Sequence, residues 1–292
     1  MNQTESLTTV QPMKFSKLPN LIIIGAMKCG TTSLHHYLNL HPQISMSRHK
    51  ELDFFIPTKK WKKGLEWYES HFNEQAEIRG EASPNYTNYP YWSGVAEKIY
   101  SVVPDAKLIY LVRDPIERII SHYVHQYAAG KEDRTINQAL TNFTNNQYIA
   151  RSQYYQQLNQ YLQCFPAENI LVLSLENLST QTESTLKIVL QFLNLDPGFD
   201  FMTGIVLHSS DFKRRKNQYG ELIADKFFRQ FLKKLPPEIR FHLEKIVYFP
   251  FSQKVEKPEV DPDLSQKLKD YLKPDIDQLR QHTGQHFSSW CI

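Results

Sequence analysis

The sequence predicts a single α/β domain of three layers, with a central, mostly parallel sheet flanked by helices. Three short apolar runs are typical of strands buried on both faces of such a sheet, at residues 21–24 (LIII), 107–112 (KLIYLV) and 169–175 (NILVLSL). Helical spacing follows the runs, and strands that alternate with helices favour parallel pairing. A chain of 292 residues with 41% hydrophobic content is long enough to bury one large core.

The first strand feeds a loop framed by Gly25 and Gly30, which allow the backbone to turn sharply and bring N–H groups close to an anion. A helix through Leu34 and Tyr37 follows, so its N-terminus points at the same anion. We call residues 25–33 the phosphate loop. Cys29 lies inside it, where the helix N-terminus favours a thiolate.

The phosphate loop is P-loop-like but is not a Walker A motif. Gly25 and Gly30 have the Walker A spacing, yet Thr31 stands where G-x-x-x-x-G-K-[ST] requires lysine, and the lysine is displaced to Lys28. In kinases the lysine after the second glycine reaches the β and γ phosphates, so the displacement disfavours triphosphate chemistry. A lysine beside the bridging oxygen of a 5′-phosphosulfate would instead stabilise the charge that develops on the leaving group, and no metal is required.

Residues 27–34 (MKCGTTSL) resemble the 5′-phosphosulfate loop, approximately P-K-x-G-T-[ST]-x-L, of sulfotransferases that use 3′-phosphoadenosine 5′-phosphosulfate (PAPS). Met27 replaces the usual proline. The resemblance runs from about Leu21 to Trp290 and implies that Lys28 stabilises the leaving oxygen. The residues it assigns to PAPS in this loop are Lys28, Cys29, Gly30, Thr31, Thr32 and Ser33. The alternative is an ordinary turn between a strand and a helix.

The second apolar run ends in Arg113, and Pro115 is well placed as the first residue of a helix. The resemblance implies that Arg113 and Ser121 bind the 3′-phosphate of PAPS, and a guanidinium fork with a hydroxyl suits one phosphate. The alternative is that Arg113 pairs with Asp114 or Glu117 at the helix start.

A basic cluster occupies residues 213–216 (KRRK), after the irregular stretch 208–211. In the resembling family a late basic loop closes over the 3′-phosphate and adenine. Arg214 and Arg215 are the first candidates, because guanidinium groups suit phosphate better than ammonium groups do. The alternative is a solvated run of charge.

Residues 49–55 (HKELDFF) resemble the K-E-x-H-F-F-like segment of heparan-type and related bacterial sulfotransferases. The resemblance implies that Glu51 is the general base, which takes the proton of the attacking acceptor. Lys50 and Asp53 are candidates for acceptor binding, with Asp53 at a position often held by histidine. Lys50 would lower the pKa of Glu51, whereas burial beside the following aromatic residues would raise it. The alternative is an exposed charged turn.

Residues 80–86 (GEASPNY) are similar to the G-E-x-[ST]-P-x-Y segment of the same enzymes. Glu81 and Ser83 are therefore candidates to line the reaction centre, or the segment only shapes a turn at the strand end. Ala82 stands where heparan-modifying members often have lysine, which weakens the case for a polyanionic acceptor. The sequence favours a carbohydrate or glycolipid acceptor and leaves open whether a hydroxyl or an amine is sulfated.

The remaining elements are expected to be helical. Thr180 and Glu183 have the spacing of a capping box for a helix through Leu193. Pro274 is expected to interrupt the helix that begins near Asp261. The other predicted helices span residues 61–72, 91–103, 219–248 with a break near 236–237, and 276–284.

Composition excludes several function classes. The net charge of +3 gives no reason to expect nucleic-acid binding, no histidine set has zinc spacing, and no apolar run reaches the ~20 residues of a membrane span. Residues 1–19 are expected to form a flexible arm before one domain at 20–292. Three cysteines, of which at least one must be unpaired, favour a reducing compartment, and the cytoplasm is the expected location. Nothing in the sequence specifies an oligomeric state.

Two rival functions are a P-loop nucleotide kinase, which would need ATP and Mg²⁺, and a non-catalytic nucleotide-binding module, which would not need Glu51.

Overall fold

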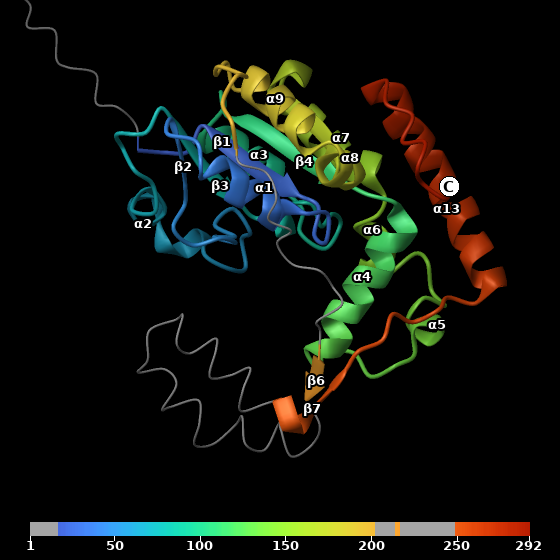
Figure 1. Cartoon of the computed structure of the whole chain (residues 1–292). Helices are drawn as coiled ribbons and strands as arrows, with labels where there is room; N and C mark the ends of the chain where they lie inside the picture. The colour runs from blue at the N-terminus through green and yellow to red at the C-terminus, as the bar shows by residue number, and fades with distance from the viewer. Residues whose placement is uncertain (1–16, 202–213, 217–248) are drawn as a thin grey trace, which may run out of the picture.

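The central sheet confirms the predicted α/β fold. A computed structural model describes residues 17–201, 214–216 and 249–292 (Figure 1). Its five-stranded sheet has the order β2-β3-β1-β4-β5, and all neighbouring strands are parallel. The strands are β1 (Leu21–Gly25), β2 (Ile44–Met46), β3 (Ile78–Ala82), β4 (Lys107–Val112) and β5 (Ile170–Ser174).

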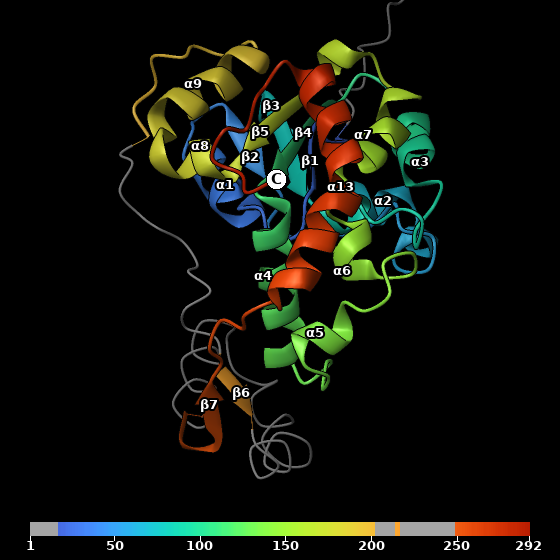
Figure 2. The ribbon, with the colours of Figure 1, turned by 90° about the vertical axis from the view of Figure 1, so that its right-hand side faces the viewer.

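Helices cover both faces of the sheet. Figure 2 shows α1, α8 and α9 on one side and α3, α7 and α13 on the other, so the three predicted layers are present. The longer helices are α1 (Thr31–Leu38), α3 (Val95–Val102), α4 (Pro115–Ala128), α7 (Tyr154–Leu162), α9 (Thr182–Phe192) and α13 (Pro262–Thr283). The shorter ones are α2 (Leu65–Glu69), α5 (Ile136–Ala139), α6 (Gln147–Ala150) and α8 (Leu175–Thr180).

A two-stranded antiparallel ribbon lies beside the far end of α4. It pairs β6 (Arg214–Lys216) with β7 (Ser252–Lys254), next to the 3-10 turn at Phe249–Phe251 (Figure 1). Part of the predicted basic cluster therefore belongs to a strand.

The helix predicted over residues 61–72 is wrong in its extent. A 3-10 turn at Trp61–Lys63 is followed by Gly64, whose φ is 80°, and only then by α2. The helix predicted over residues 91–103 begins later than expected, because Gly94, with φ of 72°, precedes α3.

The predicted interruption at Pro274 is also wrong, because α13 continues through it as one helix. A proline inside a helix costs about 3 kcal/mol. Buried leucine and isoleucine side chains stand on both sides of it, and each contributes about 1.5–3 kcal/mol. Their packing outweighs the proline; they are Leu268, Leu272, Ile276 and Leu279.

The predicted capping box is wrong as well. Thr180 is the last residue of α8 and its hydroxyl donates to the carbonyl of Glu176 at 2.8 Å, while Gln181 precedes α9. Thr180 and Glu183 have the spacing of a capping box, but the Thr180 hydroxyl is hydrogen-bonded within α8 and does not cap α9.

Several predictions lie outside the described residues: residues 1–16 of the arm predicted at 1–19, the stretch 208–211, Lys213 and the helix at 219–248. Within the described ranges, no helix combines the length and apolar character needed to cross a membrane.

Candidate active site

The candidate site lies at the carboxyl edge of the sheet, around β1. The chain leaves β1 for the edge strand β2, whereas β4 lies on the other side of β1, and ligands of open α/β sheets bind where the strand order reverses. The predicted segments meet there. The Ala26 N–H donates to the carbonyl of Leu111 at 2.6 Å, and the Glu51 N–H donates to that of Ala82 at 2.9 Å.

Both glycines of the phosphate loop are required by close packing. A Cβ on Gly25 would lie 2.0 Å from Thr87 Oγ1, and one on Gly30 would lie 2.6 Å from Leu175 Cδ1. Gly30 also has φ of 86° and precedes α1, whose N-terminus has no side-chain cap. The N-terminus of α1 therefore lies at the end of the phosphate loop without a side-chain cap, which is the arrangement that the predicted phosphate position requires.

Strained backbone is concentrated in this site. Of the five non-glycine residues with positive φ in the described part of the chain, three are predicted site residues: Lys28 (75°), Glu51 (62°) and Asp53 (50°). Such conformations cost about 1–3 kcal/mol each and persist where the surrounding structure fixes them, often at functional sites. The fold therefore holds both proposed catalytic side chains on constrained backbone.

Lys50 connects the Glu51 segment with the phosphate loop. Its ammonium lies 3.2 Å from Thr31 Oγ1 and 3.4 Å from Glu51 Oε1. Burial lowers the pKa of Lys50, and the Glu51 carboxylate opposes this shift. Glu51 itself keeps 51% of its side chain exposed, whereas Phe54 is buried in the core. Lys50 therefore lies between the Glu51 carboxylate and the phosphate loop.

Asp53 is buried and fully engaged. Its carboxylate pairs with Lys59 and accepts hydrogen bonds from Asn85 Nδ2 at 3.0 and 3.2 Å, while its N–H donates to Ser83 Oγ at 3.0 Å. Asp53 thus fixes the segment that carries Glu51.

Glu81 and Ser83 are fully buried beneath this segment. The Glu81 carboxylate accepts hydrogen bonds from the hydroxyls of Tyr68 (2.5 Å), Ser83 (2.8 Å) and Tyr86 (2.9 Å). Burial raises the pKa of Glu81 to about 7, although these hydroxyls favour the ionised form. Glu81 thereby orients Ser83, which in turn holds the backbone of Asp53.

The predicted thiolate character of Cys29 is wrong. Its side chain is fully buried under the loop, 3.8 Å from the hydroxyl of Tyr154, and burial raises its pKa to about 11. Desolvation of the thiolate outweighs the attraction of nearby positive charges.

The structure brings Arg113 and Ser121 together at a cavity of about 330 Å³ beside α4. Arg113 Nη1 donates to the carbonyl of Lys28 at 3.4 Å, which places this cavity next to the phosphate loop. Arg113 Nη2 also lies 3.6 Å from Glu117, so the alternative ion pair is present too. The cavity is lined by Arg113, Glu117, Ile120, Ser121, Val124, Lys254, Val255, Glu256 and Lys257.

Sequence reasoning missed Lys254 and Lys257 at this cavity. Their signal was a pair of lysines three residues apart, far from every recognised motif. Lys257 pairs with Glu117 at 2.7 Å. The added lysines make the surroundings of Ser121 suitable for a phosphate.

Arg214 and Arg215 lie on β6, outside the set of residues that line this cavity. Arg215 pairs with Asp133, donates to the carbonyl of Glu132 at 3.2 Å, and stacks over Tyr127 at 4.1 Å. Arg214 Nε donates to Ser252 Oγ at 2.9 Å. In the described structure both guanidinium groups bind protein partners that hold the ribbon in place.

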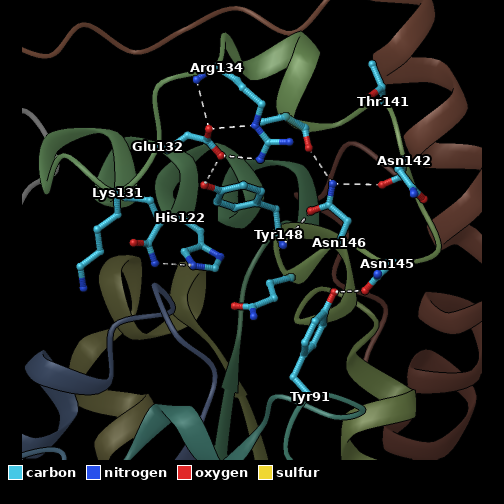
Figure 3. A pocket seen from close by; sticks show the side chains of 13 residues that line it. Tyr91, His122, Lys131, Glu132, Arg134, Thr141, Asn142, Asn145, Asn146 and Tyr148 are labelled. Atoms are coloured by element: carbon cyan, nitrogen blue, oxygen red, sulfur yellow. Dashed lines mark hydrogen bonds and ion pairs between the residues drawn. The ribbon is translucent and has the colours of Figure 1, made fainter.

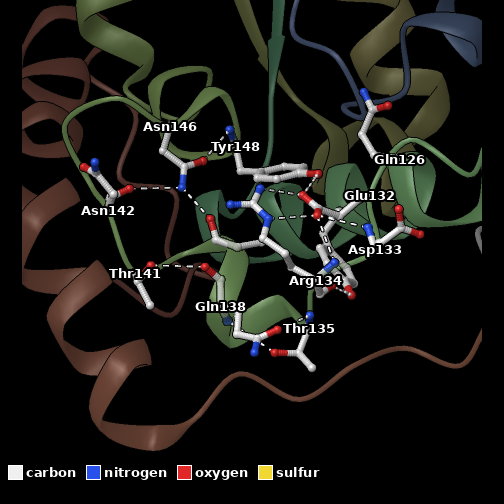
Figure 4. A network of polar contacts seen from close by, with 12 residues as sticks. Gln126, Glu132, Asp133, Arg134, Thr135, Gln138, Thr141, Asn142, Asn146 and Tyr148 are labelled. Carbon is white, nitrogen blue, oxygen red and sulfur yellow. Dashed lines mark hydrogen bonds and ion pairs between the residues drawn. The ribbon is translucent and has the colours of Figure 1, made fainter.

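A second cavity, of about 510 Å³, lies on another face of α4 (Figure 3). Amide and aromatic side chains dominate its wall, among them His122, Asn145 and Tyr91, whose hydroxyl donates to Asn145 Oδ1 at 3.0 Å. Its rim is fixed by the network in Figure 4, in which Glu132 binds Arg134 at 2.8 Å and Tyr148 at 3.0 Å. Hydrogen bonds from Arg134 lower the pKa of Glu132 to about 2.

Two residues that line this second cavity are sequence neighbours of residues closer to the phosphate loop, and none of the predicted catalytic residues lines it. His122 follows Ser121 on α4, and Tyr91 precedes Trp92, which packs against Arg151 beside the phosphate loop. Over residues 17–201, 214–216 and 249–292, no group of histidine, cysteine and carboxylate side chains has the arrangement of a metal site.

Comparisons with known proteins agree with this geometry. The sequence pattern of the family described as "Sulfotransferase domain" matches residues 18–235. Human heparan sulfate glucosamine 3-O-sulfotransferase 5 is 34% identical over 196 residues, covering 62% of this chain and 55% of the relative. The membrane-associated sulfotransferase kil1 of Dictyostelium discoideum is 43% identical over 111 residues, covering 36% of this chain and 22% of the relative. The chain thus spans only about a fifth to a half of the length of these relatives.

A solved structure shows the same fold. A sulfotransferase from Alicyclobacillus acidocaldarius superimposes with a TM-score of 0.66 at 23% identity, covering 93% of this chain and 98% of that one. With a family match over most of its length and this fold, the chain belongs to the sulfotransferase family.

Proposed function

We propose that the chain transfers the sulfuryl group of PAPS to a hydroxyl or amine of an acceptor and releases 3′-phosphoadenosine 5′-phosphate. One observation carries the proposal: two positions suited to phosphates adjoin each other, linked by the Arg113 hydrogen bond to the carbonyl of Lys28. A donor with both a 5′-phosphosulfate and a 3′-phosphate needs such a pair.

The proposed reaction is an in-line displacement at sulfur. The acceptor oxygen or nitrogen forms a bond to sulfur as the bond from sulfur to the bridging oxygen breaks. Glu51 takes the acceptor proton, and Lys28 stabilises the negative charge on the departing phosphate oxygen. Arg113 and Ser121 hold the 3′-phosphate. The half-exposed Glu51 carboxylate, with Lys50 between it and the phosphate loop, supports this assignment.

The proposed acceptor is a carbohydrate or glycolipid. The amide and tyrosine side chains of the 510 Å³ cavity offer donors and acceptors that match sugar hydroxyls, and aromatic rings that pack on sugar faces. The relative named as a heparan sulfate 3-O-sulfotransferase supports the same class of acceptor. We propose a contact with the acceptor for Lys50, beside the Glu51 carboxylate; the buried Asp53, predicted as an acceptor contact, instead supports this segment together with Glu81 and Ser83.

Thermal unfolding with ligands tests the donor. A ligand at ~100 times its dissociation constant stabilises the native state by about 2.7 kcal/mol. We expect that stabilisation with 3′-phosphoadenosine 5′-phosphate and much less with adenosine 5′-phosphate, which lacks the 3′-phosphate. Stabilisation only by ATP with Mg²⁺ would establish the kinase alternative. Transfer from ³⁵S-labelled PAPS to a panel of glycans and glycolipids tests activity, and bisphosphate binding without transfer to any acceptor would indicate a binding module.

A further inference from the structure

Arg151 is a buried arginine at the centre of the site that none of the roles above uses. Only 4% of it is exposed. Its Nη1 lies 3.5 Å from the sulfur of Met27, the residue before Lys28, and its guanidinium carbon lies 5.5 Å from the ring of Trp92. The guanidinium group therefore borders the phosphate loop at the residue before Lys28.

The direct partners of Arg151 are neutral. Nη1 and Nη2 both donate to Asn85 Oδ1 at 3.2 Å, and Nε is buried without a partner. Among the described residues no carboxylate lies within ion-pair distance of Arg151; Asp53 and Glu51 act on it only from farther away. Burial, and then the positive charge of Arg118, lowers the pKa of Arg151 to about 9.

An unpaired buried cation is costly, and a second one nearby adds to the cost. The second cation is Arg118, which is fully buried and donates a hydrogen bond to Ser152 Oγ at 2.5 Å. Its positive charge repels that of Arg151. Removing a charge from water costs several kcal/mol unless an opposite charge and hydrogen bonds replace the solvent. At Arg151 this cost falls beside the phosphate loop, where a bound anion would offset it.

The hydrogen-bonding pattern leaves one edge of the guanidinium for such an anion. Asn85 Oδ1 takes the edge formed by Nη1 and Nη2. The Nε–H and the second Nη2–H point along the adjacent edge, and their fork matches two oxygens of one oxyanion.

The location fits the group being transferred. On one side Arg151 contacts the phosphate loop through Met27, and on the other it contacts Asn85, whose amide holds Asp53, two residues after Glu51. A sulfuryl group in an in-line reaction lies between the leaving oxygen and the attacking atom. We infer that Arg151, held by Asn85, binds two oxygens of a sulfate-type oxyanion at the reaction centre. This rests on the proposed function.

Two sources can supply that oxyanion: the sulfuryl group of PAPS, or a sulfate or carboxylate already on the acceptor. The product 3′-phosphoadenosine 5′-phosphate keeps both phosphates but lacks the sulfuryl group. Comparing its affinity with that of PAPS, by calorimetric titration without acceptor, isolates contacts to the sulfuryl oxygens. The variants are Arg151→Gln, which removes the charge, and Arg151→Lys, which keeps the charge but not the fork. Arg79→Gln, at the opposite edge of the sheet, is the matched control.

If the oxyanion belongs to the donor, Arg151→Gln weakens PAPS binding by about 10- to 100-fold, the usual effect of losing charged hydrogen bonds, and changes product binding by less than ~2-fold. Arg151→Lys falls between wild type and Arg151→Gln, and Arg79→Gln changes neither ligand. If the oxyanion belongs to the acceptor, the ratio of the affinities for PAPS and for 3′-phosphoadenosine 5′-phosphate is the same in Arg151→Gln as in wild type. In that case Arg151→Gln raises KM for a sulfated glycan but not for its unsulfated form.

The inference is overturned if Arg151→Gln weakens the binding of PAPS and of 3′-phosphoadenosine 5′-phosphate equally and raises KM equally for the sulfated and the unsulfated glycan. It is also overturned if Arg151→Gln changes neither these affinities nor these KM values. Circular dichroism of each variant identifies one that has unfolded, and Arg151→Lys, which keeps the buried charge, then carries the test. Failure of the wild-type protein to bind 3′-phosphoadenosine 5′-phosphate would refute the proposed function instead, so the two failures are distinct.

Discussion

Replacing Glu81 by glutamine should change how the stability of the protein depends on pH. Glu81 is fully buried and hydrogen-bonded to three hydroxyls, and burial raises its pKa from 4.5 to about 7. The folded state therefore holds this proton more tightly than the unfolded state. Its contribution to stability is complete below pH ~4.5 and is lost as the pH rises through ~7.

The size of the effect follows from the shift in pKa. A difference of about 2.5 pKa units, at 1.36 kcal/mol per unit, corresponds to about 3 kcal/mol lost between pH ~4.5 and ~8. For 292 residues, an unfolding entropy of ~2.1 cal/mol/K per residue gives ~0.6 kcal/mol/K, so the melting temperature changes by about 5 °C. Glutamine keeps the shape, can accept from the two tyrosine hydroxyls and can donate to Ser83 Oγ.

Scanning calorimetry at half-unit intervals from pH 4.5 to 8.5 measures the effect. Other groups titrate in this range, so the informative quantity is the difference between the wild-type and Glu81→Gln curves. We expect that difference to change by about 5 °C in favour of glutamine as the pH rises. Glu183→Gln, in an exposed pair with Lys187, is the control and should give a curve parallel to wild type. Parallel curves for Glu81→Gln would refute the raised pKa.

Further predictions concern the donor site and the phosphate loop. Lys28→Ala and Glu51→Gln should each lower kcat by at least ~100-fold, the scale of lost electrostatic or general-base assistance, in a transfer assay with labelled PAPS; near-normal turnover would remove that residue from the mechanism. Arg113→Gln should weaken 3′-phosphoadenosine 5′-phosphate by ~10-fold or more and leave adenosine 5′-phosphate unchanged, because only the former carries a 3′-phosphate; equal losses in titration calorimetry would contradict this role. Cys29 should resist a thiol reagent until the protein unfolds, because its side chain is fully buried. The exposed Cys291 has a similarly raised pKa of about 11, so comparing the two cysteines by peptide mass mapping isolates the effect of burial. Modification of Cys29 and Cys291 at the same rate in the folded protein would contradict the burial of Cys29.

Much of the donor site was predictable because its signals are local. The run of residues 21–24, the two glycines and the displaced lysine are adjacent in sequence, and backbone geometry converts them directly into a strand, a turn and a helix N-terminus. The resemblance paired Arg113 with Ser121, and both line one cavity because the end of β4 and the helix α4 that follows it carry them.

Other sequence signals failed where packing decided the outcome. The Pro274 prediction failed because buried side chains on both sides of the proline keep α13 intact. The Cys29 prediction failed because a helix N-terminus acts on charge, whereas complete burial acts more strongly against it. Neither burial nor packing can be evaluated from neighbouring residues alone.

The sequence by itself determined the fold class, the phosphate loop and the resemblance to the family, because each depends on residues that are close along the chain. Only the tertiary structure decided which distant side chains come together: Lys50 contacts Thr31, Arg151 contacts Met27, and Lys254 lines the same cavity as Ser121. These pairings depend on the strand order β2-β3-β1-β4-β5 and on how α4 and α7 pack against the sheet. The charge left unpaired at Arg151 is likewise a property of that packing, since its neighbours come from segments far apart in the chain.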